Sequence, residues 1–164
     1  MELWAPVEDY PNYIVSNEGA IRSELTGREM HARPNQTGVM NVSLENEFGR
    51  TTRSLAVVVA SAHCKRQPYP HFNTVIHLDG DRRNCHADNL DWRPRWFAIQ
   101  FHKQFLRLPY VDTQPFVEMH TGEVYRSPLH AAIAHGLLEA QVIGSFANGE
   151  PVSMTGDQFD RANY

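Results

Sequence analysis

The chain has 164 residues, of which 41% are hydrophobic, and its formal net charge at pH 7 is -4. This hydrophobic content is enough for a folded core and excludes a wholly disordered chain, and no apolar run approaches the roughly 18 residues that a membrane span needs. The start of the chain lacks a signal-peptide pattern, and the two cysteines fit a reducing compartment, so we expect a cytoplasmic protein with no membrane partner.

Residues 2–23 predict a small β-hairpin. Tyr13-Ile14-Val15 has the composition of a strand, Ser16-Asn17-Glu18-Gly19 that of a turn, and Ala20-Ile21-Arg22 that of the return strand. A second strand is predicted over 38–44, followed by a turn at Gly49-Arg50. The apolar run at 54–63 then fits either a buried strand or a buried helix.

Residues 74–92 combine an apolar strand with a polar loop. Thr74-Val75-Ile76-His77-Leu78 predicts a strand that ends at an Asp79-Gly80 turn, and a loop rich in Asn, Asp and His leads to Asn89-Leu90-Asp91-Trp92. His77 would lie at the end of the strand, next to the turn. An aspartate in the position of Asp79 usually forms the turn by accepting hydrogen bonds from backbone amides.

Residues 115–149 predict a hairpin followed by two helices. Phe116-Val117-Glu118-Met119 and Val124-Tyr125 would pair around a turn at 120–123. Ser127-Pro128 is a good helix start, with serine as N-cap and proline in the first turn, and Gly136 is a typical helix end. A second helix is expected from Glu139 to Ala147, with Val142, Ile143 and Phe146 on one face.

These motifs resemble the HNH homing endonucleases of phages and introns. In that family His-x-Asp-Gly, Asn-Asn and Asn-Leu-x-Trp recur at the spacing of 74–92. Trp-x-Pro and Tyr-x-Val-Ser-Asn-x-Gly-x-x-Arg-Ser, at 4–6 and 13–23, are similar to its N-terminal hairpin module. Thr121-Gly122-Glu123-Val124-Tyr125, with Ser127 and Ala131-Ala132, resembles its C-terminal DNA-binding module.

The resemblance implies a modular α+β fold. A hairpin module would cover 1–30, and an HNH-like core of the ββα (His-Me finger) type would cover 31–102. A linker at 103–115 would lead to a hairpin plus helix-turn-helix module at 116–164. The family has a short helix behind the core, so we interpret 54–63 as a core helix.

The resemblance also implies a catalytic centre. His77 takes the position of the general base, and Asn84 and Asn89 match asparagines of the motif loop. A nuclease of this kind would use Mg²⁺ or Mn²⁺, but Ile76 and Ala98 occupy the expected ligand positions and have no lone pairs to offer. Asp79 and His102 are weak substitutes, so the resemblance leaves activity open.

Nucleic-acid contacts are expected from cations of the core and from polar groups of the second helix. The net charge disfavours duplex binding, which draws affinity from Lys and Arg, yet 93–107 holds four cations and no acid. The candidate contact residues are Arg22, Arg82, Arg83, Arg93, Arg95, Lys103, Gln141, Ser145 and Asn148.

Three functions fit this sequence. The first is a nucleic-acid-binding protein with HNH architecture and a degenerate, inactive nuclease centre, most simply on duplex DNA. The second is an active metal-dependent endonuclease or nickase that uses His77. The third is a phage interaction protein, acting in the host cytoplasm, that has turned the fold toward structured RNA, a ribonucleoprotein or a host protein.

Overall fold

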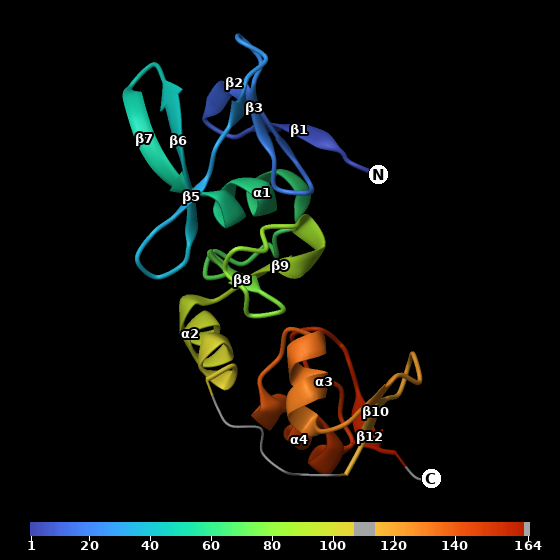
Figure 1. Cartoon of the computed structure of the whole chain (residues 1–164). Helices are drawn as coiled ribbons and strands as arrows, with labels where there is room; N and C mark the ends of the chain where they lie inside the picture. Colours follow the sequence, from blue (N-terminus) through green and yellow to red (C-terminus); the bar gives the residue numbers. More distant parts are fainter. Residues whose placement is uncertain (107–113, 163–164) are drawn as a thin grey trace. The chain divides into compact units, whose positions relative to one another are not determined.

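The computed structural model describes residues 1–106 and 114–162. The chain forms two compact units, Met1–Ala98 and Ile99–Tyr164, and the boundary between them falls within one helix. Helices accompany several small antiparallel sheets (Figure 1), which confirms the predicted α+β class. In the part of the chain that the structure describes, no helix combines the length and the apolar composition needed to cross a membrane.

The first unit begins with a four-stranded antiparallel sheet of order β1-β2-β3-β4. Its strands are Trp4–Val7, Tyr10–Ser16, Ile21–Ser23 and Glu29–Met30. The predicted hairpin is β2 and β3, in which Val15 pairs with Ile21, and both side chains are buried. Strand β1 was not predicted, because Pro6 argues against a strand. A proline is tolerated there since β1 lies at the sheet edge.

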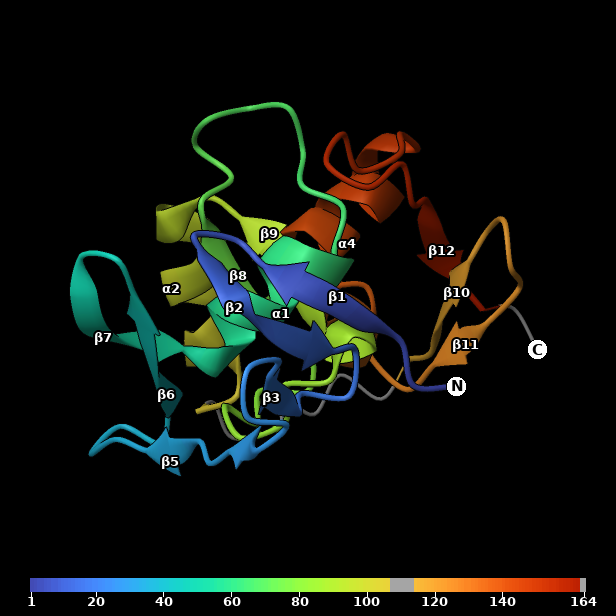
Figure 2. The same cartoon turned by 90° about the horizontal axis from the view of Figure 1, so that it is seen from above.

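A three-stranded sheet and a buried helix follow. The sheet has the order β5-β6-β7, with strands Arg33–Pro34, Met40–Asn46 and Gly49–Ser54. Residues 54–63 form a helix as predicted, α1 (Leu55–His63). It contacts strands of three sheets, which explains why it is apolar on nearly every side (Figures 1 and 2).

The first unit ends in a ββα element, whose helix runs on into the residues of the second unit. Strand β8 (Thr74–His77) pairs antiparallel with β9 (Leu90–Arg93), and the long loop between them contains the 3-10 turn η1 (Ala87–Asn89). Helix α2 (Arg95–Gln104) follows directly. The first residues of the predicted linker, 103–104, therefore belong to this helix, and 107–113 lie outside the described residues.

The second unit packs two helices against a small sheet of order β11-β10-β12. The strands are Val124–Tyr125, Phe116–Glu118 and Phe159–Arg161, and the helices are α3 (Pro128–Ala134) and α4 (Glu139–Asn148). Ser127 caps α3 as predicted: its side chain accepts a hydrogen bond from His130 N. The core contains Phe116, Leu137, Val142 and Phe159.

Two expectations for this unit need correction. Ile143 is exposed, and it is Val142 that faces the core, with Phe146 packed at its margin. Strand β12 was not predicted, because Phe-Asp-Arg offers only one apolar residue to a pattern search.

Candidate functional site

The candidate nuclease centre begins at His77, the last residue of β8. Its side chain is buried, and Leu90 lies opposite on β9. The chain then turns at Asp79-Gly80, where Gly80 N donates to His77 O at 3.0 Å. Gly80 has a φ of 76°, a conformation that glycine adopts without steric cost. The backbone therefore holds the imidazole at the point where the strand gives way to the loop.

The loop after His77 is held by the side chains of Asn84 and Asn89. Asn89 Oδ1 accepts from Asp79 N at 2.9 Å, and Asn89 Nδ2 donates to Asp79 Oδ1 and Asn84 O, both at 2.9 Å. Asn84 Nδ2 donates to Asp79 Oδ2 at 2.7 Å. Both asparagines thus fix the loop. A direct part for them in catalysis stays a prediction.

Asp79 is the acceptor at the centre of this loop. Besides the two amide donors, its Oδ1 accepts from Asp81 N at 2.8 Å. Partial burial opposes ionisation of Asp79, but the hydrogen bonds from Asn84, Asn89 and the Asp81 backbone outweigh it and hold the pKa below its ordinary value. The carboxylate is therefore ionised and already engaged by protein donors, as expected for a turn former.

The positions expected to hold a metal ion are apolar and closed. Ile76 is fully buried in β8, and Ala98 is buried in α2. Neither side chain has a donor atom, whereas Mg²⁺ and Mn²⁺ require oxygen or imidazole ligands. Within residues 1–106 and 114–162, no group of three or more His, Cys, Asp or Glu side chains is arranged to hold a metal ion. The side chains of Ile76 and Ala98 therefore offer no ligand to the divalent ion that the family resemblance implies.

The candidate cations divide into exposed and buried groups. Arg22, Arg83, Arg95 and Lys103 are exposed. The guanidinium of Arg22 lies 4.7 Å from the centre of the Trp4 ring. Arg82 is half-buried, and its Nη1 donates to Thr37 O at 3.3 Å. Arg107 lies outside the described residues.

Arg93 departs from expectation. It is only 4% exposed, and its Nη1 lies 2.6 Å from Asp91 Oδ2, with a further hydrogen bond to Trp92 O at 3.0 Å. The guanidinium also lies over the Phe97 ring. A cation committed to an internal ion pair is a structural residue, so Arg93 does not belong with the surface contacts.

Helix α4 presents fewer of the expected polar groups than its sequence suggested. Ser145 is buried: its Oγ donates to Glu150 O at 2.7 Å and accepts from Phe159 N at 3.1 Å. Gln141 Oε1 accepts from Leu138 N at 2.9 Å and so caps the helix. Asn148 is exposed as expected. The outward assignment of Ser145 was wrong because β12, which takes up its hydroxyl, was not foreseen.

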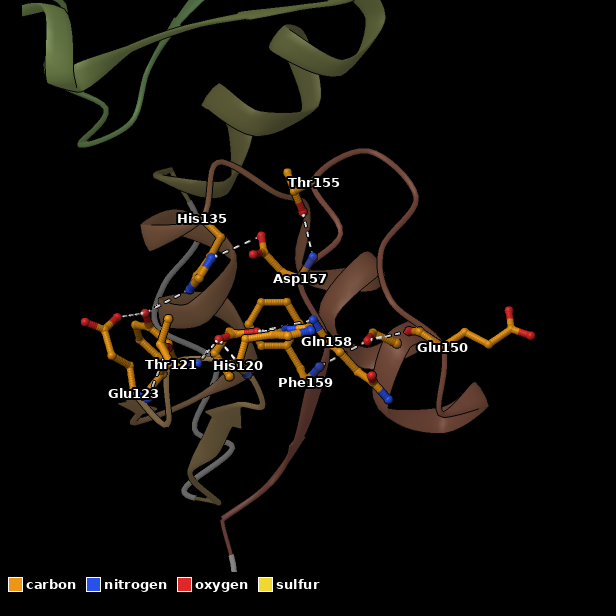
Figure 3. Close-up of polar contacts among 12 residues, drawn as sticks. His120, Thr121, Glu123, His135, Glu150, Thr155, Asp157, Gln158 and Phe159 are labelled. Carbon is orange, nitrogen blue, oxygen red and sulfur yellow. Dashed lines mark hydrogen bonds and ion pairs between the residues drawn. The ribbon is translucent and has the colours of Figure 1, made fainter.

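Two polar clusters of the second unit escaped sequence analysis (Figure 3). The first surrounds Glu118, a fully buried carboxylate of β10. Its Oε2 accepts from His120 N at 3.0 Å and Thr121 N at 2.7 Å, and its Oε1 contacts His120 Nδ1 at 2.9 Å and Gln158 N at 3.4 Å. Glu118 shares the buried face of β10 with Phe116, so alternation along the predicted strand is the signal that could have placed it in the core.

The second cluster is a chain of four side chains that joins β11, α3 and the C-terminal segment. Tyr125 Oη donates to Glu123 Oε2 at 2.5 Å and contacts His135 Nε2 at 2.9 Å. His135 Nδ1 lies 3.1 Å from Asp157 Oδ2. Figure 3 shows the contact between His135 and Asp157. Burial and the Glu123 carboxylate raise the pKa of Tyr125, so the hydroxyl keeps its proton.

Comparisons with known proteins agree with this architecture. Residues 2–45 match the family model of the NUMOD4 motif, a motif found in HNH endonucleases. Over 92 residues, 56% of this chain, the sequence is 34% identical to a protein of Acanthamoeba polyphaga mimivirus described as an uncharacterized HNH endonuclease. The chain spans 23% of the length of that relative.

A solved structure extends the likeness to nearly the whole chain. The HNH homing endonuclease I-HmuI, whose structure describes DNA binding and cleavage, matches with a TM-score of 0.56 over 99% of both chains at 20% identity. This match concerns the fold. The chain thus resembles HNH endonucleases in sequence and has the fold of an HNH homing endonuclease.

Proposed function

We propose that this protein binds nucleic acid, most simply duplex DNA, with an HNH homing-endonuclease architecture whose metal centre is incomplete. The observation that carries the proposal is that the loop after His77 is ordered by hydrogen bonds, whereas the two expected metal-ligand positions hold apolar residues. The loop that follows His77 is held by the side chains of Asn89 and Asp79, while Ile76 and Ala98 are buried and apolar. The fold of I-HmuI, described in DNA binding and cleavage, supports the choice of DNA.

Exposed cations support nucleic-acid binding even though the net charge of the chain is negative. Arg82, Arg83, Arg95 and Lys103 lie in or next to the ββα element, and the exposed members can reach phosphates. In the second unit, α3 and α4 are consecutive helices joined by a short turn at 135–138. We propose that they act as a helix-turn-helix, with Asn148 among the exposed polar groups of α4.

The test measures binding and cleavage with the same protein. Fluorescence anisotropy on a pool of random-sequence duplexes, repeated across salt concentrations, reports affinity and its salt slope. We expect binding that weakens steeply with salt, and a smaller slope in Arg83→Gln/Lys103→Gln. A chain that binds no duplex at low salt, or binds with no salt dependence, would contradict the proposal.

Cleavage is followed on supercoiled plasmid and on the duplex pool with Mg²⁺ or Mn²⁺. We expect no nicking by the wild-type chain. Nicking that disappears in His77→Ala would overturn the incomplete centre and identify an active nuclease. The double variant Ile76→Asp/Ala98→Asn returns oxygen ligands to the two positions and should gain measurable Mn²⁺ binding by calorimetry, whereas Ile76→Leu/Ala98→Ser should not.

A further inference from the structure

The segment between α1 and β8 is an exposed loop of unusual composition. Residues 65–73, the aromatic loop, read Lys-Arg-Gln-Pro-Tyr-Pro-His-Phe-Asn. All of them are exposed except Phe72, which is buried. The loop arches away from α1 and β8 in Figure 2, where it is drawn in green. No candidate residue for nucleic-acid contact lies in it so far.

The rings of this loop form a small stack. The Tyr69 and His71 rings are stacked, with centroids 5.6 Å apart and planes at 21°. The Phe72 ring is tilted against both, with its centroid 6.1 Å from Tyr69 and 5.0 Å from His71. Tyr69 nevertheless keeps 57% of its surface exposed. A phenol ring held by neighbours and open to solvent is ready to stack with a further flat group.

The backbone under the stack is held in place. Phe72 N donates to Tyr69 O at 3.0 Å. Arg66 Nε donates to Phe72 O at 2.9 Å, and its guanidinium lies 4.6 Å from the centre of the buried Trp92 ring. Pro68 and Pro70 restrict φ on either side of Tyr69. A platform that is ordered before binding loses little conformational entropy when a ligand stacks on it.

The charge of this part of the sequence favours an anionic ligand. No Asp or Glu occurs in the sequence between Glu47 and Asp79, although the chain as a whole has a net charge of -4. Lys65 and Arg66, both exposed, precede the ring residues in the sequence. Aromatic rings beside cations are the means by which proteins hold unpaired bases, since the ring stacks on the base and the cation neutralises the phosphate.

We infer that the aromatic loop binds an unpaired nucleobase, which stacks on Tyr69 while Lys65 contacts the adjoining phosphate. The inference rests on the proposed nucleic-acid binding and adds a structural class of target to it. The loop leads directly into β8, the strand that ends at His77. A bulged, gapped or single-stranded site would therefore be preferred to continuous duplex.

The test compares a duplex with the same duplex carrying one bulged 2-aminopurine. The wild-type chain should bind the bulged duplex more tightly and quench the 2-aminopurine fluorescence by stacking. Tyr69→Ala should lower affinity for the bulged duplex by about 5- to 150-fold and abolish the quenching, with no change for the paired duplex. Tyr69→Phe, which keeps the ring, should behave as the wild type.

Control variants separate this loop from other exposed aromatic groups. Phe48 is 88% exposed at the tip of the β6–β7 hairpin, and Phe48→Ala should leave both affinities unchanged. Circular dichroism and melting temperature establish that Tyr69→Ala folds. Matched DNA and RNA bulges show whether the base alone or also the ribose hydroxyl is recognised, and tighter binding of either supports the inference.

The results of these binding experiments test the inference separately from the proposed nucleic-acid binding. Equal affinity for paired and bulged duplex, or quenching that survives in Tyr69→Ala, overturns the inference and leaves nucleic-acid binding in place. A chain that binds neither duplex nor bulged or single-stranded oligonucleotide overturns both.

Discussion

At the scale of single residues, the loop that follows His77 depends on amide side chains. Asn89 alone joins Asp79 N, Asp79 Oδ1 and Asn84 O, so it spans the whole loop with one side chain. A side chain that satisfies several backbone and carboxylate groups cannot be shortened without leaving some of them unpaired. This explains how the frame around His77 persists although its ligand positions are apolar.

Asn89→Ala should therefore destabilise the first unit by about 1–3 kcal/mol. Urea unfolding followed by tryptophan fluorescence measures the change, and hydrogen exchange should rise at 78–84. Asp88 is the matched control because its side chain is 94% exposed. Asp88→Asn should change the free energy of unfolding by less than about 0.5 kcal/mol. Equal effects of the two substitutions would show that the hydrogen bonds of the Asn89 side chain contribute nothing to the free energy of unfolding.

Glu118 makes the second unit sensitive to acid. Burial opposes its ionisation, but hydrogen bonds from His120 and from the backbones of Thr121 and His120 outweigh burial and lower the pKa from 4.5 to about 2. Because the folded pKa lies below the unfolded one, the stabilisation is fully present above about pH 4.5 and is lost as pH falls toward 2.

Glu118→Gln should remove this pH dependence and lower stability at pH 7. The amide keeps one acceptor oxygen but turns a donor toward backbone N–H groups, so a loss of about 1–3 kcal/mol is expected. Thermal unfolding of both chains between pH 2 and 7 measures it. A difference between the two chains that stays constant over this range would refute the assignment.

At the scale of elements, helix α4 offers a matched pair of glycines. Gly144 lies within the helix, and an added Cβ would meet nothing within 4 Å. Gly149 follows the helix with a φ of 65° and also has open space around it. The two positions therefore differ in backbone conformation and not in available room.

Gly144→Ala should stabilise the second unit by about 0.5–1 kcal/mol, since alanine loses less backbone entropy in a helix. Gly149→Ala should destabilise it by about 1–2 kcal/mol, because a Cβ disfavours the left-handed conformation. Chemical denaturation followed by circular dichroism compares the two. Changes of the same sign would mean that the end of α4 is not fixed by Gly149.

The elements also show how far sequence reasoning reached. The β2–β3 hairpin and the start of α3 were predicted correctly from local patterns, namely strand composition around a turn and a Ser-Pro cap. The apolar run of α1 fits a strand as well as a helix, and the family resemblance favoured the helix. Arg93 and Ser145 were misplaced because their partners lie in tertiary contacts. Asp91 draws the Arg93 guanidinium inward, and Phe159 of the unforeseen β12 takes up the Ser145 hydroxyl.

At the scale of the whole molecule, the two units have separate cores. Leu137 is buried in the core of the second unit, and Leu44 is buried in the first. All three tryptophans, Trp4, Trp92 and Trp96, belong to the first unit. Tryptophan fluorescence therefore reports on one unit only.

Leu137→Ala should cost about 2–5 kcal/mol through the cavity it leaves. We expect the amide resonances of 116–162 to report unfolding at a lower denaturant concentration than in the wild type. The unfolding transition of the first unit, followed by tryptophan fluorescence, should stay at the same concentration. Leu44→Ala should do the reverse. If either substitution moves both transitions together, the units unfold as one.

The outer position of β7 bears on the solubility of the whole protein. It ends the β5-β6-β7 sheet, and Arg50, Thr51, Thr52 and Arg53 are all exposed. An outer strand rich in threonine is a template for pairing with another copy, and like charges on that strand oppose such pairing. The charges of the two arginines would thus oppose aggregation. A solution of the Arg50→Gln/Arg53→Gln variant should scatter light at concentrations where a solution of the wild-type chain stays clear.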